Sequence, residues 1–174
     1  MPGTIIPNQM YDHEANVIKG WPHMHAVDKS ADIAAGEVIL AGRVCYLDAD
    51  AKFRLGLPDN VVGHFAWPNS TDFDVSADVG NIQKAVMMAL PCVAAYELYT
   101  TEFDDAFTYV PNDHLTAWDS HLGGYDPLKK GKVFPCRPYE NTVVGIVTEA
   151  VKQNDFKKEV LSLWTYYLPI AVGS

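Results

Sequence analysis

One central stretch of the chain, from Gly36 to Trp67, constrains the fold more strongly than any other part. It contains short runs of alternating side-chain character, separated by breaks that are rich in turn residues. Because successive side chains of a strand point to opposite faces of a sheet, this pattern predicts consecutive strands joined by tight turns. We therefore predict a half-buried antiparallel meander. Its runs are residues 44–47, 53–57 and 61–67, and its breaks are residues 48–51 and 58–60.

Strand signals continue after this stretch, because β-branched and aromatic residues recur between turn residues. Residues 107–110 and 114–118 flank the turn sequence Pro-Asn-Asp, which predicts a hairpin. Residues 119–138 contain three glycines and three prolines and are expected to be a loop-rich excursion. Residues 81–90 fit either a short helix or a strand. The other expected strands are residues 73–76, 92–103, 141–151 and 160–170.

Roughly eight to ten short strands are expected in total, which predicts an all-β fold. The candidate architectures are a β-sandwich resembling a jelly roll and a small barrel of short antiparallel strands. The first 34 residues differ, because they carry Pro2, Pro7 and Pro22 and show no sustained period. We therefore divide the chain into an extended N-terminal arm, residues 1–34, and a β-rich core domain, residues 35–174.

The arm contains isolated apolar side chains and no pattern that would bury them locally. Either it lies across its own domain or it docks on another chain, and we favour docking. The residues expected to supply docking contacts are Ile5, Ile6, Met10, Tyr11, Val17, Ile18 and Trp21.

The formal net charge of −9 argues against a nucleic-acid-binding surface, because neutralising phosphates requires clustered lysine and arginine. The short basic clusters at 129–132 and 157–158 are expected to be solvated turns. No apolar run approaches the roughly 20 residues that span a bilayer. The N-terminal sequence also lacks the basic and apolar segments of a secretory signal. The sequence therefore predicts neither a nucleic-acid nor a membrane partner.

The sharpest candidate for chemistry is the pair His23 and His25. Two histidines two positions apart on a strand point the same way, as imidazoles do in several metal sites. A small cupin-like metal-binding enzyme is therefore one alternative. A cupin, however, places such a pair inside a barrel, after earlier strands and after a more distant glycine than Gly20. We favour two exposed or interface histidines, and expect no bound metal and no cofactor.

The remaining acids form no recognisable catalytic pattern. Glu102, Asp104 and Asp105 could serve acid–base chemistry or bind calcium, but three acids at a strand end are more often a solvated turn. Asp48 and Asp50 resemble a calcium loop only vaguely, because the glycine and the terminal glutamate of such a loop are missing.

The histidines and cysteines give no stronger signal. No acid or nucleophile that would define a triad adjoins the other three histidines considered, and the common nucleotide-binding, hydrolase and zinc-protease motifs are absent from the sequence. The cysteines have no CxxC spacing and are expected to be reduced thiols. We predict a non-enzymatic protein without catalytic residues. The histidines without a triad partner are His64, His114 and His121, and the cysteines expected to be reduced are Cys45, Cys92 and Cys136.

The strand-rich sequence resembles the auxiliary capsid proteins of tailed bacteriophages, which are called cement or decoration proteins. The resemblance covers residues 36–170 and lies in the general style of the strands. Its clearest pieces are Gly-Glu-Val-Ile-Leu (36–40), Val-Cys-Tyr-Leu-Asp (44–48), Phe-Arg-Leu-Gly-Leu (53–57) and Val-Val-Gly-His-Phe (61–65). Later pieces of the same kind are residues 96–103, 114–118, 144–147 and 160–164.

This resemblance implies a non-enzymatic structural protein of the virion, made in the cytoplasm of a bacterial host. It implies binding to the outer surface of an icosahedral capsid, where such proteins bridge neighbouring major capsid protein subunits. Members commonly self-associate as dimers or trimers and often dock through an extended terminal arm. A phage tail or receptor-binding component is a second alternative, because such components are also rich in β-strands.

Overall fold

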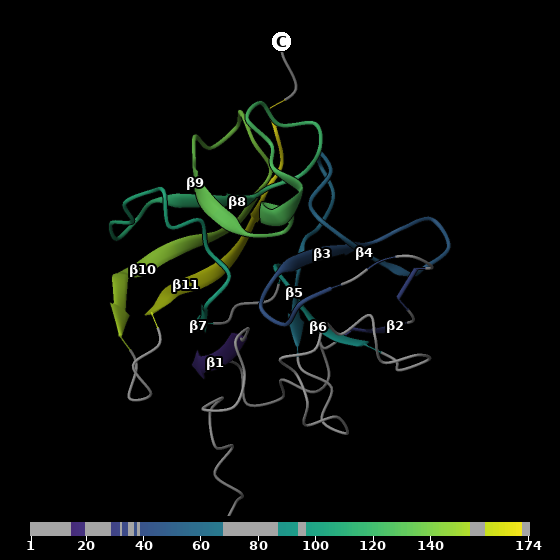
Figure 1. The fold of residues 1–174 in the computed structure, drawn as a ribbon, viewed down its shortest axis with the longest axis horizontal. Helices are drawn as coiled ribbons and strands as arrows, with labels where there is room; N and C mark the ends of the chain where they lie inside the picture. The colour runs from purple at the N-terminus through teal and green to yellow at the C-terminus, as the bar shows by residue number, and fades with distance from the viewer. Residues whose placement is uncertain are drawn as a thin grey trace, which may run out of the picture.

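The computed structural model describes residues 15–19, 29–31, 33–34, 37, 39–67, 87–93, 97–153 and 159–171. The predicted all-β fold is confirmed: eleven strands form two antiparallel sheets, with one short 3-10 helix, η3 (Pro127–Lys129), among the described residues. The two sheets lie beside each other, as a sandwich-like pair of layers (Figure 1).

Six strands form the first sheet, here called sheet A. In spatial order they are β1 (Ala15–Lys19), β7 (Glu97–Thr100), β11 (Glu159–Leu168), β10 (Val143–Gln153), β8 (His114–Ala117) and β9 (Val133–Cys136). Five strands form sheet B. In spatial order they are β2 (Lys29–Ala31), β6 (Met87–Pro91), β5 (His64–Trp67), β3 (Val44–Leu47) and β4 (Phe53–Leu55).

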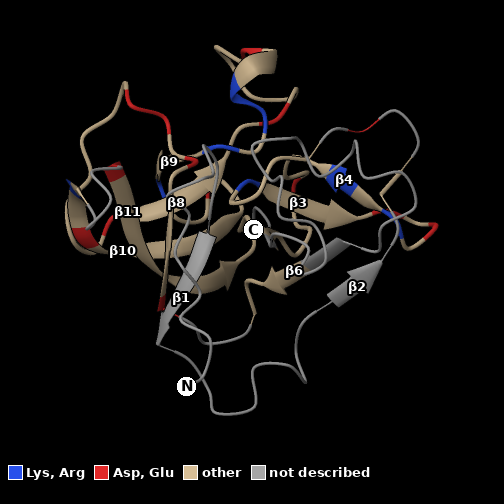
Figure 2. Ribbon diagram, turned by 60° about the horizontal axis from the view of Figure 1, so that its bottom comes forward, with Lys and Arg blue, Asp and Glu red and all other residues tan. Residues whose placement is uncertain are grey.

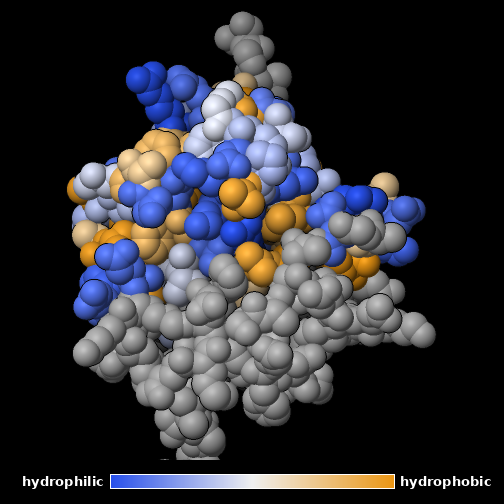
Figure 3. Space-filling model, in the orientation of Figure 1, coloured by the Kyte–Doolittle hydropathy of each residue, from blue (hydrophilic) through white to orange (hydrophobic). Residues whose placement is uncertain are grey.

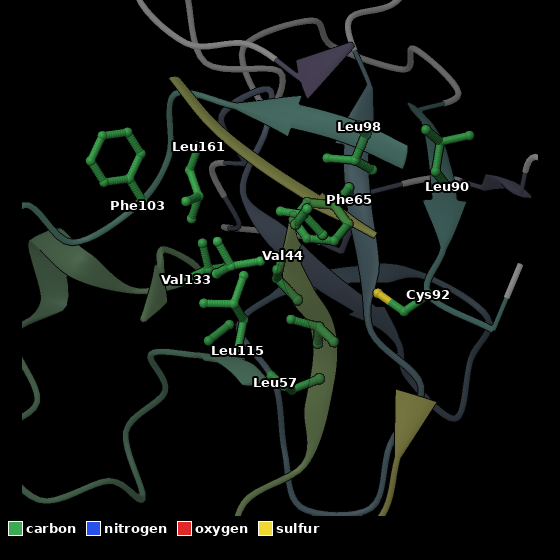
Figure 4. Close-up of a cluster of buried hydrophobic side chains, with 14 of the residues drawn as sticks. Val44, Leu57, Phe65, Leu90, Cys92, Leu98, Phe103, Leu115, Val133 and Leu161 are labelled. Carbon is green, nitrogen blue, oxygen red and sulfur yellow. The ribbon is translucent and has the colours of Figure 1, made fainter. Parts of the chain in front are cut away.

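The main hydrophobic core lies between the two sheets (Figure 4). Sheet A and its loops contribute Leu98, Phe103, Tyr109, Leu115, Ala117, Val133, Val144, Val147, Leu161 and Leu163. Sheet B and its loops contribute Val44, Leu57, Phe65, Leu90 and Cys92. Since burying one large apolar side chain stabilises a fold by about 1.5–3 kcal/mol, this cluster is the main force that holds the layers together.

A second, smaller core covers the opposite face of sheet B. It joins Ile39 and Ala41 to Cys45, Phe53, Leu55, Ala66 and Ala89. Residues on both faces of β3 and β5 are therefore buried. The prediction of a half-buried stretch is wrong, because the segment before β3 folds back over the outer face of sheet B.

The predicted meander is also wrong, although its three strands are present. β5 pairs with β3, on the edge away from β4, so the spatial order is β5-β3-β4. The connection from β4 to β5 is drawn towards sheet A. The backbone N–H of Leu57 donates to Asp119 Oδ2 at 2.9 Å, and that of Asn60 donates to Thr142 Oγ1 at 2.8 Å. These bonds lead the chain past β4 to the other side of β3.

Two segments of the expected arm belong to the sheets of the core. β1 pairs with β7, and β2 pairs with β6. For these segments the arm lies across its own domain, which is one of the two arrangements considered. The edge of β4 is also covered, since Ala34 N–H donates to the carbonyl of Phe53 at 2.9 Å and Glu37 accepts from Leu55 N–H.

The predicted hairpin of residues 107–118 is wrong. β8 pairs with β9 and β10, while residues 107–110 form no strand. Tyr109 explains the difference, because its buried hydroxyl donates to the carbonyl of Asp104 at 2.7 Å and folds this segment onto the core. The expected loop at 119–138 contains β9, although Pro135 lies in that strand.

The remaining strand predictions have mixed outcomes. Strands β10 and β11 are confirmed. Among the described residues of the run 92–103, β7 is the only strand, and Phe103 forms a single bridge. The ambiguous run 81–90 is a strand from Met87 onwards, and the expected strand at 73–76 lies outside the described residues.

Two adjacent residues of β11 test this packing because they face opposite ways. Leu163 is fully buried in the main core, whereas Trp164 is 38% exposed on the outer face. We expect Leu163→Ala to lower the free energy of unfolding by about 3 kcal/mol. The matched change Trp164→Thr should cost no more than about 1 kcal/mol. Urea denaturation of both variants measures the difference, and equal losses would contradict the assigned faces.

Candidate functional site

The acids predicted to form a solvated turn are largely buried. Glu102 and Asp104 are only 2% and 1% exposed, while Asp105 is exposed. Arg43 Nε donates to Glu102 Oε2 at 2.7 Å, and Arg43 Nη1 donates to the carbonyl of Lys130 at 3.0 Å. The solvated-turn prediction is therefore wrong for Glu102 and Asp104, because ion pairing compensates their removal from water.

Asp104 is the most heavily bonded carboxylate in this region. It accepts Lys129 Nζ at 2.9 and 3.0 Å, Trp118 Nε1 at 2.9 Å and the backbone N–H of Ala106 at 3.1 Å. Burial raises the pKa of Asp104, but these hydrogen bonds and the charge of Lys129 outweigh burial, so the net pKa lies below its usual value. The hydrogen bond from Lys129 to Asp104 in turn raises the pKa of Lys129.

A third buried acid, Asp119, ties the same region to sheet B. Besides Leu57 N–H, its carboxylate accepts Ser120 N–H and lies 3.9 Å from Lys130 Nζ. Gly56 lies directly against it with a φ of +110°, and an added Cβ there would approach Asp119 Oδ2 to 2.6 Å. Glycine at position 56 therefore allows the backbone to reach this carboxylate.

We call these three ion pairs the inter-sheet clasp: Arg43–Glu102, Lys129–Asp104 and Lys130–Asp119. Two contacts of the clasp cross between the sheets: Arg43, just before β3, pairs with Glu102, and Asp119 accepts Leu57 N–H, just after β4. The pairs Lys129–Asp104 and Lys130–Asp119 fasten the segment at η3 to the residues that follow β7 and β8, and Figure 2 shows basic residues in the chain next to η3. Lys129 and Lys130 are thus not a freely solvated turn, as predicted for the cluster at 129–132. Because each of the three carboxylates has a structural partner, the geometry fits a stabilising role.

Metal binding gains no support from the described residues, which contain no cluster of three or more histidine, cysteine or acidic side chains suited to an ion. Asp48 instead closes its own turn, accepting the N–H groups of Asp50 and Lys52 and pairing with Arg54 at 2.7 Å. The described part of the chain also has no helix long and apolar enough to cross a membrane.

The histidines and cysteines of the core hold structural positions. His64 packs edge-on against Phe53, and His121 pairs with Asp59 at 3.0 Å, a contact that sequence spacing does not reveal. Burial raises the pKa of all three thiols, to about 12 in the case of Cys136. All three cysteines are free of disulfides.

Most of the predicted site residues lie outside the described residues. These are Ile5, Ile6, Met10, Tyr11, Trp21 and the pair His23 and His25. Val17 and Ile18 lie in β1, where Val17 is in register with Leu98. Docking by the arm therefore stays a prediction.

Sheet A carries an unexpected surface on the side away from the main core. One row of in-register residues crosses β7, β11, β10, β8 and β9; its members are Glu97, Trp164, Ile146, His114 and Cys136. Lys19 of β1 is in register with Glu97 at one end. Tyr166, two residues beyond Trp164, lies edge-on to His114 with ring centroids 6.4 Å apart.

Further aromatic rings extend this surface at β9, which contains Phe134, and at the loop residue Phe107. Phe134 stacks on Trp118 at 4.1 Å and on Phe107 at 5.6 Å. We define the aromatic face by six residues: Trp164, Tyr166, Ile146, His114, Phe134 and Phe107. The alternation of Leu161 and Leu163 with Trp164 and Tyr166 is visible in the sequence and is the signal that could have predicted it.

Comparison with protein-family models, with curated proteins and with solved structures finds no match for this chain. The proposals below therefore depend on the chain's own residues and on the resemblance noted from its sequence.

Removing one partner of the clasp tests its contribution to stability. We expect Asp104→Asn to lower the free energy of unfolding by about 2 kcal/mol, because it breaks charged hydrogen bonds in a buried place. Lys129→Met should lower the free energy of unfolding less in the Asp104→Asn variant than in the wild type, and the difference, the coupling energy, should be about 1 kcal/mol. The exposed neighbour Asp105 supplies the control, Asp105→Asn. Additive effects of the two clasp changes would contradict the pairing.

The lowered pKa of Asp104 predicts how this contribution depends on pH. A carboxyl with a lower pKa in the folded state than its unfolded value of about 4 stabilises the fold above that value. Its contribution is lost as the pH falls through the folded pKa. The stability difference between the wild type and Asp104→Asn should therefore be constant near neutrality and shrink below about pH 4. Denaturation at several pH values measures it, and a difference that grows towards acid would refute the assignment.

Proposed function

We propose that this protein is a non-enzymatic structural protein of a tailed-bacteriophage virion. In this proposal it binds the outer surface of the icosahedral capsid and stabilises the shell by bridging major capsid protein subunits. Self-association as a dimer or trimer is part of the proposal. The observation that carries it is a contrast within the core domain. The buried acids of the clasp are bonded to structural partners, whereas large aromatic side chains remain exposed on sheet A.

The exposed aromatic side chains favour binding over catalysis. Trp164, Tyr166 and Phe107 are between 38% and 40% exposed. Contiguous apolar surface rimmed by polar residues is typical of protein interaction sites. Hydrophobic groups also reach the surface between hydrophilic ones in the space-filling view (Figure 3).

The charge of the chain is compatible with a position on the outside of a shell. A net charge of −9 would keep such a protein from competing for packaged DNA. Binding only to the assembled shell would stabilise that state by mass action, and symmetric repetition would multiply modest contacts. The resemblance to cement and decoration proteins supplies the identity of the proposed partner.

The direct test is whether the protein co-purifies with intact virions. We expect hundreds of copies on each particle, because an icosahedral shell repeats its binding position many times and each position would hold roughly one copy or more. Quantitative mass spectrometry of purified virions measures the copy number. A handful of copies would favour a tail or receptor-binding component, and absence from the particle would overturn the proposal.

A truncation tests the role of the arm without removing a strand. Deletion of residues 1–14 ends before β1, so we expect the unfolding transition to be retained. The same deletion removes Ile5, Ile6, Met10 and Tyr11 and should lower particle binding by about tenfold or more. A full-length variant with these four residues changed to serine is the matched control for chain length. Unchanged binding by both variants would disprove docking through these residues.

A further inference from the structure

We propose that the aromatic face of sheet A binds a basic segment of a partner protein, in which lysine or arginine side chains alternate with apolar ones. The inference rests on the proposed function in so far as the partner is a protein surface, and it adds the chemistry of the contact. It concerns a part of the molecule distinct from the N-terminal docking residues.

The composition of the face first points to a protein partner. The solvent side of an antiparallel sheet ordinarily carries polar residues. Here the in-register neighbours Trp164, Ile146 and His114 occupy that side, with Tyr166 beside His114. Tryptophan and tyrosine dominate binding energy at protein interfaces because they bury much area at little conformational cost.

The strands present these rings on a rigid support. β10 and β11 are the longest strands of the sheet, with eleven and ten residues, and they pair along most of their length. Phe134 is held between Trp118 and Phe107 by ring stacking. A preorganised surface loses little entropy when a partner docks, which favours a flat, extended contact.

The charges near the aromatic face indicate which kind of partner segment would bind there. Four of the cations near sheet A are already committed to acids: Lys129 and Lys130 to the clasp, Lys152 to Glu149, and Arg137 to Glu140. Asp105 lies two residues before Phe107 and Asp113 directly precedes His114, and neither forms an ion pair with a described residue. Figure 2 shows acidic residues at the ends of β10 and β11.

This balance favours a basic partner over a second copy of the chain. Two copies would each bring a net charge of −9 to the contact. Lysine or arginine side chains would instead pair with the bordering acids and could lie on the rings of Trp164 and Tyr166 through cation–π attraction. Apolar residues between them would cover Ile146 and Phe107.

The test uses the full chain and two synthetic peptides, one alternating arginine and leucine and one alternating glutamate and leucine. We expect wild-type protein to bind the arginine peptide at least about tenfold more tightly than the glutamate peptide. Binding should weaken severalfold between about 50 and about 500 mM salt.

The variant Trp164→Thr should bind the arginine peptide about tenfold more weakly than the wild type does. The control Val93→Thr removes an exposed apolar side chain next to sheet B and should leave binding unchanged. Fluorescence anisotropy of labelled peptides measures each affinity.

Several results would overturn the inference. These are the absence of binding to the arginine peptide, equal binding of both peptides, and a Trp164→Thr variant that binds as the wild type does. A concentration-dependent dimer that Trp164→Thr abolishes would assign the face to a second copy instead. The virion copy number decides the proposed function separately, so failure of one experiment is distinguishable from failure of the other.

Discussion

The inter-sheet clasp is the constraint on which the arrangement of the two layers depends. Apolar packing is non-directional and would allow the sheets to slide, whereas the Arg43–Glu102 pair and the hydrogen bond from Leu57 N–H to Asp119 join them with fixed geometries. Asp104 holds Lys129 of η3, and the nearby Gly131 carbonyl accepts Val44 N–H of β3. The clasp is also costly, because its carboxylates are largely removed from water and need their partners there. Its acids therefore serve the architecture of the core domain.

Local pattern predicted which residues form strands better than it predicted how the strands pair. Alternation located β3, β4, β5, β10 and β11, because side-chain period and turn chemistry are encoded within a few residues. The order β5-β3-β4 depends on bonds from Leu57 and Asn60 to residues more than sixty positions away, which no local window contains. The ion pair between Arg43 and Glu102 also joins residues far apart in the sequence, 59 positions in this case. It allows Glu102, which was expected at the surface, to be buried. The aromatic face could have been predicted from the sequence, because Trp164 and Tyr166 alternate with core leucines along one strand.

The outer face of sheet B is covered by apolar residues of the chain, whereas the outer face of sheet A carries exposed rings. Sheet B is covered by the chain's own residues, with Ile39 and Ala41 packed over Cys45 and Phe53. The aromatic face of sheet A retains exposed rings. The two outer faces of the molecule therefore differ, and the face with exposed rings is the one that we propose binds a partner. In a larger assembly, avidity rather than single-site affinity would determine how long such a contact lasts.

The cysteines of the core domain have a consequence for the chemical reactivity of the chain. A thiol exchanges and oxidises mainly through its thiolate, and burial raises the pKa of Cys136 to about 12, which leaves little thiolate at neutral pH. Cys45 and Cys92 are more deeply buried, and their pKa values are raised as well. With little thiolate present, these three cysteines are expected to be slow to oxidise or to exchange with other thiols. The packing that holds the sheets together thus also protects the chain chemically.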